Sequence, residues 1–459
     1  MKKHLLFTLI TAIAICLVMT VAAFADSTPI KLGDTVKATF LENGGAANVY
    51  EYSFTLKKSG SLKINVTSTV DNRIWYTLNG TDLISSVVAR DNYSATAGYI
   101  SKGDTDLKYE LAAGEYVFKL EGEYTTAGDL AFTTDFESAK ETYTNDNNSV
   151  NAIRKSDALT FNKKVYGHFA FNDSDDWYKV VLPASGKLTL DAHVDADGIT
   201  YRLDDADGGF IAEKFIGKGD ETIELELAKG TYYLHFNENG FGKYNFKPTF
   251  KYAKETYQFE NETINLVRSR KAIPFATVIK GHFGINDTED VFKIKAPKSG
   301  KYTIKVTSAM DNIYLNVRDK NDEWVAEYFH NNGSKYYTVK LKKGSNYLIF
   351  KADSNDYGKY SIKVTPAKVS IKTLKKATKA AKVTWSKGTG DGYQLQYSTS
   401  SSFKTYKTKN VSNITTTSKT IKSLKSKKTY YVRIRTYVKA SNGDKIWSDW
   451  SKAKSVKTL

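Results

Sequence analysis

The stretch GHFAFNDSDDWYKV, Gly167 to Val180, returns 114 residues later as GHFGINDTEDVFKI, Gly281 to Ile294, without a gap. Each copy has a loop rich in carboxylates that leads into alternating apolar and polar residues, and this alternation is typical of a half-buried β-strand. A second pair of segments, ETYTNDNNSVNAI from Glu141 and ETYQFENETINLV from Glu255, keeps the same spacing. The sequence therefore predicts repeated β-modules of about 114 residues.

A third and more distant copy comes first in the chain. KGDTDLKYELAAGEYVF from Lys102 matches KGDETIELELAKGTYYL from Lys218, and the connections between the copies are short. We expect each module to be large enough for its own core and to pack against its neighbours. The predicted limits are 27–137, 138–252 and 253–366 for the three modules and 368–459 for a final domain.

The composition favours short strands joined by turns. Tyr and Phe are abundant, with 31 and 23 residues, whereas the chain has six Pro and three Met. No convincing long helix follows the first 25 residues. The expected fold class is all-β, with tandem jelly-roll-like β-sandwiches and a C-terminal immunoglobulin-like sandwich.

At the N-terminus, two lysines precede an apolar run, Leu5 to Ala23, that ends in Ala-Phe-Ala. This order is typical of a secretory signal peptide over residues 1–25, with Asp26 as the first mature residue. An uncleaved membrane anchor is the alternative, because the run approaches spanning length. The single cysteine, Cys16, lies inside the signal, so the mature chain is expected to form no disulfide, as suits a bacterial exoprotein.

The net charge of +17 is concentrated in the final domain. Residues 368–459 contain 22 Lys and Arg against three Asp, a net of +19, whereas residues 26–367 contain 43 basic and 47 acidic residues, a net of −4. The lysines alternate with Thr and Ser, without a basic helix or an aromatic RNA-binding signature, so nucleic acid is not the expected partner. Anionic wall polymers or acidic glycans are expected instead, held by salt-sensitive attraction. An ordinary solubilising surface is the alternative.

The order G-x-F-x-x-N-D-x-x-D, then S-G-K, then K-G-x-Y-Y-L or a variant, then G-K-Y resembles the bacterial pre-peptidase C-terminal domain, a jelly-roll-like β-sandwich. The resemblance covers 138–252 and 253–366, whereas 27–137 keeps only the later half of the pattern. It implies an accessory domain of secreted proteins, often beside a peptidase, that in some cases binds matrix or polysaccharide. The chain carries no recognisable peptidase.

The same resemblance implies a candidate calcium site, because some domains of that family hold calcium between the carboxylate loop and an acidic segment at the start of the module. The matching residues here are Glu141, Asn145, Asp146 and Asp173. Tyr143 stands where a second carboxylate is expected. The alternative is that these Asp and Asn side chains cap turns by accepting backbone N–H bonds.

The final domain resembles a fibronectin type III domain. Trp385 occurs early, in V-T-W, and Leu424 lies six residues before Tyr430 in a segment that continues as YYVRIRTY. The resemblance implies that the Trp fills the core and that the Leu and Tyr pack at a corner before the sixth strand.

The WSDWS segment, Trp447 to Ser451, resembles the motif in which receptor domains of this fold stack Trp rings against Arg. Trp447 and Trp450 are therefore expected to contact Arg433 and Arg435 through cation–π interactions. We assign these residues a stabilising role.

Exposed aromatic rings in sugar-binding sandwiches stack on pyranose faces, and Trp75 and Trp324 are the candidate ligand-binding residues. Trp177 is a weaker candidate, because the next copy has Val291 at its position, which indicates a packed side chain.

Catalytic motifs are missing from the sequence, which has no H-E-x-x-H, no G-x-S-x-G and no mature cysteine. His168 and His282 are equivalent in the repeat and fall in predicted strands, which favours a structural role. Neighbouring acids such as Asp204 and Asp205 leave glycoside hydrolysis as an alternative. We expect no enzyme activity.

Together these features predict a secreted or cell-wall-associated, non-catalytic binding or adhesion protein. Its expected partner is an extracellular polysaccharide, a wall polymer or a matrix protein, with no nucleic acid and no membrane span in the mature chain. Calcium is the one candidate cofactor. The alternatives are an accessory targeting subunit for a separate secreted hydrolase and, more distantly, an unrecognised glycan-active enzyme.

Overall fold

The computed structural model describes residues 27–42, 48–80, 97–123, 125–143, 150–171, 173–257, 263–353 and 356–459. The predicted signal peptide therefore lies outside the described residues. In the described part of the chain, no helix is both long enough and apolar enough to cross a membrane.

The chain divides into two compact units. The first comprises Met1–Val181, Thr189–Ile223 and Thr231–Thr249, and the second comprises Leu182–Leu188, Glu224–Gly230 and Phe250–Leu459.

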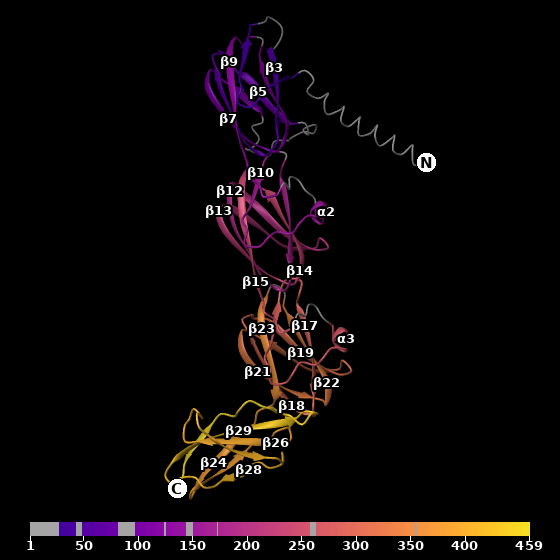
Figure 1. The fold of residues 1–459 in the computed structure, drawn as a ribbon, viewed down its shortest axis with the longest axis vertical. Helices are drawn as coiled ribbons and strands as arrows, with labels where there is room; N and C mark the ends of the chain where they lie inside the picture. Colours follow the sequence, from indigo (N-terminus) through magenta and orange to yellow (C-terminus); the bar gives the residue numbers. More distant parts are fainter. Residues whose placement is uncertain are drawn as a thin grey trace, which may run out of the picture. The chain divides into compact units, whose positions relative to one another are not determined.

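Two sheets form the β-sandwich of the first module (Figure 1). One sheet has the strand order β1-β3-β8-β5-β6 and the other has the order β2-β9-β4-β7. Alternation decides which side chains enter the core, as in β4, where Leu62, Ile64 and Val66 are buried. The strand bounds are β1 Thr28–Pro29, β2 Thr35–Phe40, β3 Asn48–Leu56, β4 Gly60–Ser68, β5 Ile74–Gly80, β6 Ala97–Ile100, β7 Gly103–Leu111, β8 Gly114–Gly122 and β9 Gly128–Ser138.

Longer strands build the second module. Its sheet has the order β10-β15-β12-β14-β11, and β13 pairs with β12. The 20-residue strand β12 spans the two segments that form β4 and β5 in the first module. The elements are α2 Val150–Ile153, β10 Val165–Phe169, β11 Asp175–Leu182, β12 Gly186–Asp205, β13 Phe210–Leu227, β14 Gly230–Glu238 and β15 Gly242–Tyr252.

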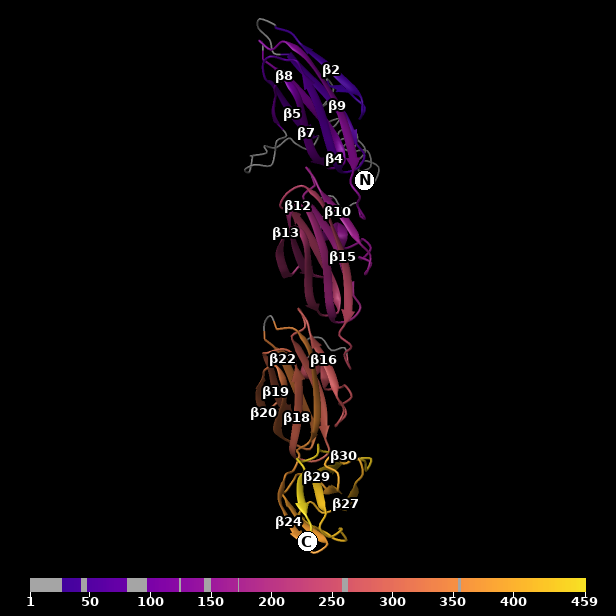
Figure 2. The ribbon, with the colours of Figure 1, turned by 90° about the vertical axis from the view of Figure 1, so that its left-hand side faces the viewer.

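The third module again has two sheets, of order β16-β23-β18-β21 and β17-β22-β19-β20 (Figure 2). Alternation along β18 places Tyr302, Ile304 and Val306 in the core. The elements are α3 Ile264–Val267, β16 Ile279–Phe283, β17 Glu289–Ala296, β18 Gly300–Ser308, β19 Ile313–Asp319, β20 Trp324–His330, β21 Gly333–Leu341, β22 Gly344–Ala352 and β23 Gly358–Pro366.

The final domain packs a three-stranded sheet, β24-β25-β28, against a sheet of order β27-β26-β29-β30, with β31 on β29. Its core gathers Trp385, Tyr393, Leu395, Val432 and Ile434. The strand bounds are β24 Ile371–Ala377, β25 Ala380–Trp385, β26 Gly392–Ser398, β27 Lys407–Val411, β28 Ser418–Ile421, β29 Thr429–Lys439, β30 Lys445–Trp447 and β31 Lys454–Lys457.

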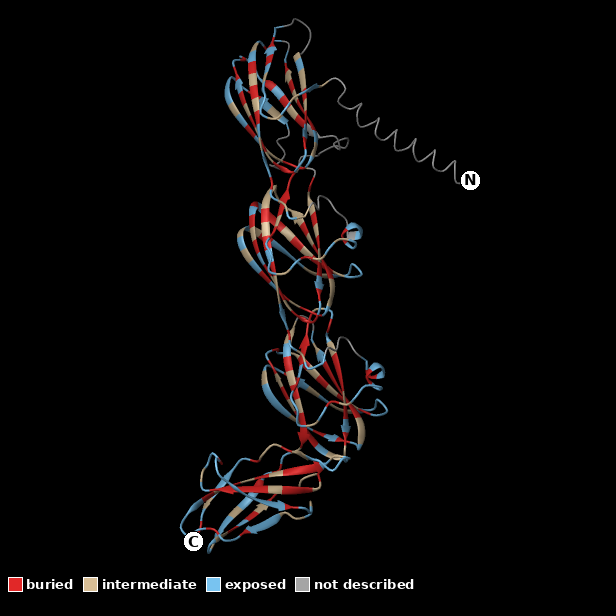
Figure 3. Cartoon of the chain, viewed as in Figure 1, coloured by how far each residue is buried: buried red, intermediate tan, exposed pale blue. Residues whose placement is uncertain are grey.

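Buried and exposed residues alternate along the strands of every module, as Figure 3 shows. Among the described residues, the helices are the two four-residue elements α2 and α3. The prediction of an all-β chain of several sandwiches is therefore confirmed.

Candidate functional site

The repeated histidines lie on short strands inside the protein. His168 in β10 and His282 in β16 are both inaccessible to solvent. The Nε2 atom of His168 lies 2.7 Å from a carboxylate oxygen of Glu110 in β7, and that of His282 lies 2.8 Å from Glu226 in β13. Each histidine thus contacts a carboxylate from the preceding copy of the repeat.

The glycine before each histidine makes room for a buried tyrosine. A Cβ atom on Gly281 would lie 2.3 Å from the ring of Tyr360, so only glycine fits without a shift. The Tyr360 hydroxyl donates a 2.5 Å hydrogen bond to the carboxylate of Asp290. Burial and the Asp290 charge raise the pKa of Tyr360 well above its usual value, so the phenol stays protonated. The equivalent residues of the second module are Gly167, Tyr244 and Asp176.

The structure describes two of the four predicted calcium ligands, Glu141 and Asp173. The other two, Asn145 and Asp146, lie outside the described residues. Burial raises the pKa of Tyr178 well above its usual value, and nearby carboxylates that include both described ligands add to the shift. Within the described ranges, no three His, Cys, Asp or Glu side chains are arranged to hold a metal ion, and calcium binding stays a prediction.

The carboxylate of Asp175, in the same carboxylate-rich stretch as Asp173, is held by side chains of β14. Its Oδ1 atom lies 2.6 Å from Nε2 of His235, and it accepts a hydrogen bond from Asn237. The imidazole of His235 stacks on the half-buried ring of Trp177, with 3.9 Å between the ring centroids. Sequence reasoning missed this cluster, although one signal was present, since the next copy has Ile349 where this module has His235.

An exposed aromatic pair lies on the outer face of the first module. Trp75 of β5 and Tyr99 of β6 are cross-strand partners, and each is 48% exposed. Their rings meet edge to face at a centroid distance of 5.0 Å, and the guanidinium of Arg73 lies 4.5 Å from the Tyr99 ring centroid. The ligand candidate Trp75 therefore stands in an aromatic and cationic patch at a sheet edge.

The third module repeats this pair at the equivalent position. Tyr314 of β19 and Phe329 of β20 are cross-strand partners with ring centroids 5.2 Å apart. The second ligand candidate, Trp324, lies near the start of the pairing between the same two strands, is 54% exposed and contacts the guanidinium of Arg318 at 4.8 Å. Both candidates are thus exposed; Trp324 contacts an arginine directly, and Trp75 contacts a tyrosine that itself contacts an arginine.

In the final domain, Trp385 is buried in the core, and the hydroxyl of Tyr430 accepts a 3.1 Å hydrogen bond from the backbone N–H of Lys425. Leu424, next to that N–H group, is also buried. The three residues therefore lie where the sequence resemblance implied a core Trp and a Leu–Tyr corner.

The tryptophans of the WSDWS segment and the two arginines predicted to contact them form a ladder, in which aromatic rings and guanidinium groups alternate. The guanidinium carbons of Arg433 and Arg435 lie 4.5 and 4.4 Å from the ring centroid of Trp450. Arg435 also lies 4.0 Å from Trp447, and Arg433 lies 4.2 Å from Phe403, which the sequence did not suggest. Two glutamine side chains of β26 accept hydrogen bonds from these guanidinium groups and fix their planes.

A basic groove of about 560 Å³ lies on the final domain. Three lysine side chains and the 53% exposed ring of Tyr406 border it. The lysines are Lys407, Lys425 and Lys428. Hydroxyl groups of Ser and Thr line much of the rest, so the groove offers cationic and hydrogen-bonding groups together.

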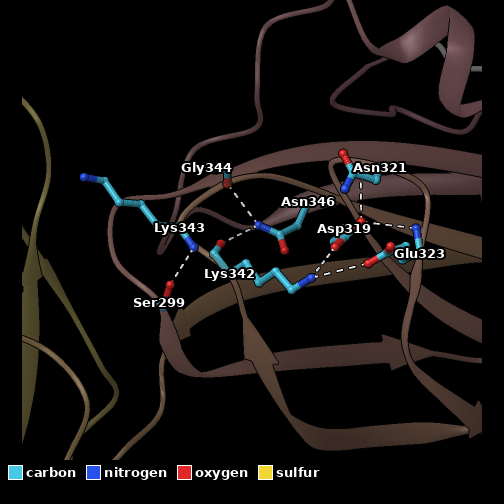
Figure 4. A network of polar contacts seen from close by, with 8 residues as sticks. All are labelled: Ser299, Asp319, Asn321, Glu323, Lys342, Lys343, Gly344 and Asn346. Atoms are coloured by element: carbon cyan, nitrogen blue, oxygen red, sulfur yellow. Dashed lines mark hydrogen bonds and ion pairs between the residues drawn. The ribbon is translucent and has the colours of Figure 1, made fainter.

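A polar network in the third module holds one acidic turn, as Figure 4 shows. The buried carboxylate of Asp319 accepts hydrogen bonds from the backbone N–H groups of Asn321 and Glu323 and from Nζ of Lys342, at 2.9, 3.1 and 2.7 Å. The hydrogen bond from Lys342 is the main cause that lowers the pKa of Asp319 to about 2. The carboxylate thus acts as a turn cap.

The acidic pair that left glycoside hydrolysis open as an alternative also has protein partners. Asp205 accepts hydrogen bonds from the backbone N–H groups of Asp207 and Gly209 at 2.9 and 2.7 Å. Asp204 is buried and lies 2.8 Å from Nε of Arg202. Both carboxylates have protein partners that account for their position.

Comparisons with known proteins give no family for this chain. No protein-family model and no curated protein sequence matches it. It is similar over 37% of its length to a solved β-1,2-glucanase from Parabacteroides distasonis, at 10% identity and a TM-score of 0.17, and it spans 30% of that enzyme. It is similar over 38% of its length to a two-domain fibronectin type III segment of chicken tenascin, all of which is covered, at 16% identity and a TM-score of 0.20. Because both TM-scores are low, neither likeness bears on function.

Proposed function

We propose that this chain is a secreted or cell-wall-associated, non-catalytic binding protein for an extracellular polysaccharide, wall polymer or matrix protein. The observation that carries the proposal is the repeated aromatic pair, Trp75 with Tyr99 and Tyr314 with Phe329, at equivalent outer positions of two modules. Large exposed apolar groups gathered at one place mark interaction sites.

The aromatic patches suit a sugar polymer. Each ring offers a flat apolar face, and Arg73 beside Tyr99 and Arg318 beside Trp324 supply donors for hydroxyl or carboxylate groups of the ligand. Two similar patches on one chain raise the strength of binding to a repetitive polymer, because the second contact forms at high effective concentration.

The final domain favours anionic polymers. Its net charge of +19 and its lysine-bordered groove support long-range attraction of a negatively charged chain. This part of the binding weakens as salt rises, because the Debye length falls from about 10 Å at 0.1 M to about 3 Å at 1 M salt.

We also propose a family for each part. The repeated sequence motif and the sandwich form of 138–252 and 253–366 support pre-peptidase C-terminal domains, with 27–137 as a divergent copy. The strand order β24-β25-β28 opposite β27-β26-β29-β30, with Trp385 in the core, supports a fibronectin type III domain over 368–459. Residues 1–25 are proposed as the signal peptide.

Binding of the full mature chain to a polysaccharide array and to purified bacterial walls tests the function. The double variants Trp75→Ala with Tyr99→Ala and Tyr314→Ala with Phe329→Ala should each weaken binding at least tenfold. Tyr252→Ala, which removes a 52% exposed aromatic ring elsewhere, is the matched control and should leave binding unchanged.

Three results would contradict the proposal. They are full binding by both double variants, co-purification with a separate hydrolase as the only interaction, and release of sugar product from an array ligand. The second result would favour the accessory-subunit alternative, and the third would favour a glycan-active enzyme.

A further inference from the structure

The histidine–glutamate contact is one part of a larger junction within the first unit. Leu111, next to Glu110 at the end of β7, forms a parallel bridge with Phe171, just after β10. The backbone N–H of Phe171 donates to the carbonyl of Glu110 at 2.9 Å, and the N–H of Ala112 donates to the carbonyl of Phe171 at 3.1 Å. Glu110 is therefore bound through its carbonyl and through its carboxylate, which meets His168.

The second unit contains the same junction one repeat later. Leu227 forms a parallel bridge with Ile285, whose N–H donates to the carbonyl of Glu226 at 2.8 Å. The N–H of Ala228 donates to the carbonyl of Ile285 at 3.3 Å. A Cβ atom on Gly284 would lie 2.5 Å from the backbone of Leu227, so the two chain segments approach closely.

Both glutamates are favoured in their charged form. Burial by itself raises the pKa of Glu110 and of Glu226. The hydrogen bond from the histidine and the charges of nearby lysines together exceed this effect, so both pKa values are lowered. The lysines are Lys243 for the first junction and Lys187 and Lys359 for the second. Ser61 also donates to Glu110.

The partners of this contact are missing at the two ends of the array. Thr39 of β2 occupies the position of His168 and His282. Each of these three residues is followed by a Phe, and that Phe pairs with a glycine at the start of the neighbouring strand. Lys340 of the third module stands four residues before Gly344, as Glu110 stands before Gly114. The first module therefore lacks the histidine, and the third, which precedes a different kind of domain, has the opposite charge in place of glutamate.

We infer that the buried histidine of one module and the glutamate of the module before it form a matched pair that docks like modules onto each other and restricts the bending of the junction. The repeated GHF stretch presents the histidine and the main-chain edge, and the end of the preceding strand presents the glutamate. The first module lacks this histidine, and the third module lacks this glutamate.

Spin labels on the full chain test this inference, because the mature chain has no cysteine of its own and accepts labelled cysteines at chosen sites. Labels replace the exposed residues Lys247 and Lys295 in successive modules. Glu226→Lys, which copies the third module, should at least double the width of the label-to-label distance distribution. Glu213→Lys is the matched control, since Glu213 is an exposed residue near the other end of β13; it should leave the width unchanged.

Two further variants keep the test decisive. His282→Thr, which copies the first module, should broaden the distribution as Glu226→Lys does. Adding His282→Glu to Glu226→Lys should narrow it again, because a carboxylate and an ammonium group then meet across the junction. Calorimetry checks that each module still unfolds cooperatively. An unchanged width in Glu226→Lys and His282→Thr, or equal broadening by Glu213→Lys, would overturn the inference.

Discussion

Trp450 joins two arginines of the ladder in the final domain, and its removal should destabilise that domain more than the loss of a comparable exposed tryptophan. The ring contacts Arg433 at 4.5 Å and Arg435 at 4.4 Å. Both guanidinium groups are partly buried, and burial lowers the pKa of each without discharging it. Trp450→Ala removes both contacts at once and leaves two cations side by side.

The expected size of the effect follows from the two contacts. At partly buried sites a cation–π contact contributes about 1 kcal/mol, so the two contribute about 2 kcal/mol to the free energy of unfolding. In a domain of this size, about 2 kcal/mol lowers the melting temperature by about 8–16 °C. The matched control is Trp324→Ala, which removes one contact, to Arg318, from a ring that is 54% exposed. It should cost about 0.5 kcal/mol.

Differential scanning calorimetry of the full chain measures the change, because independent domains give separate transitions. Trp450→Phe keeps an aromatic face and should recover about half of the lost stability. A loss in Trp450→Ala no larger than the loss that Trp324→Ala causes in the third module would contradict the stabilising role of the ladder. The same loss on raising the salt concentration, without any substitution, would also contradict it.

Three more outcomes are expected. Gly281→Ala should cost about 1–3 kcal/mol in chemical denaturation, because its Cβ would overlap the Tyr360 ring that Asp290 holds in place; an unchanged midpoint would contradict this. Calcium should raise the melting temperature of the second module and EDTA should lower it through linkage, and identical melts in both would remove the calcium prediction. The pKa of Asp319 is depressed to about 2, so its contribution to stability is present above pH 4 or so and is lost as the pH falls through about 2. Acid unfolding followed by circular dichroism should therefore begin at higher pH in Lys342→Met, and equal acid midpoints would contradict the pairing.

The fold could be predicted because both of its signals can be read directly from the order of the residues. Period-two alternation identifies strands within six to nine residues, and the spacing of 114 between copies gives the module size. The structural role of His168 could also be predicted from the repeat. Its partner could not, because Glu110 lies 58 residues earlier, in another module, and strand pairing alone brings the two together.

The aromatic patches were only half predictable. Trp75 and Trp324 stand out by residue type, but their surroundings depend on which strands pair at the sheet edge. Tyr99 meets Trp75 across the β5–β6 pair, which no local pattern in the sequence identifies. The alternation around Tyr314 does place it opposite the core-facing residues of β19, yet its contact with Phe329 needs the register of β20.

A comparison of the copies separates two roles within the same module. The histidine and the glutamate of the junction recur at both places where two modules meet, as with His168 and His282, and they are replaced at the ends of the array. Residues at the outer edge differ between copies, since Trp75 of the first module corresponds to Thr200 in the second and to Tyr314 in the third, by their equivalent places on the strand. A joining role demands that each copy match its neighbour, whereas contact with an external ligand leaves each copy free to differ. The carboxylate-rich stretch that repeats so closely is therefore best explained by how modules join, and the variable aromatic edge is where the ligand should be sought.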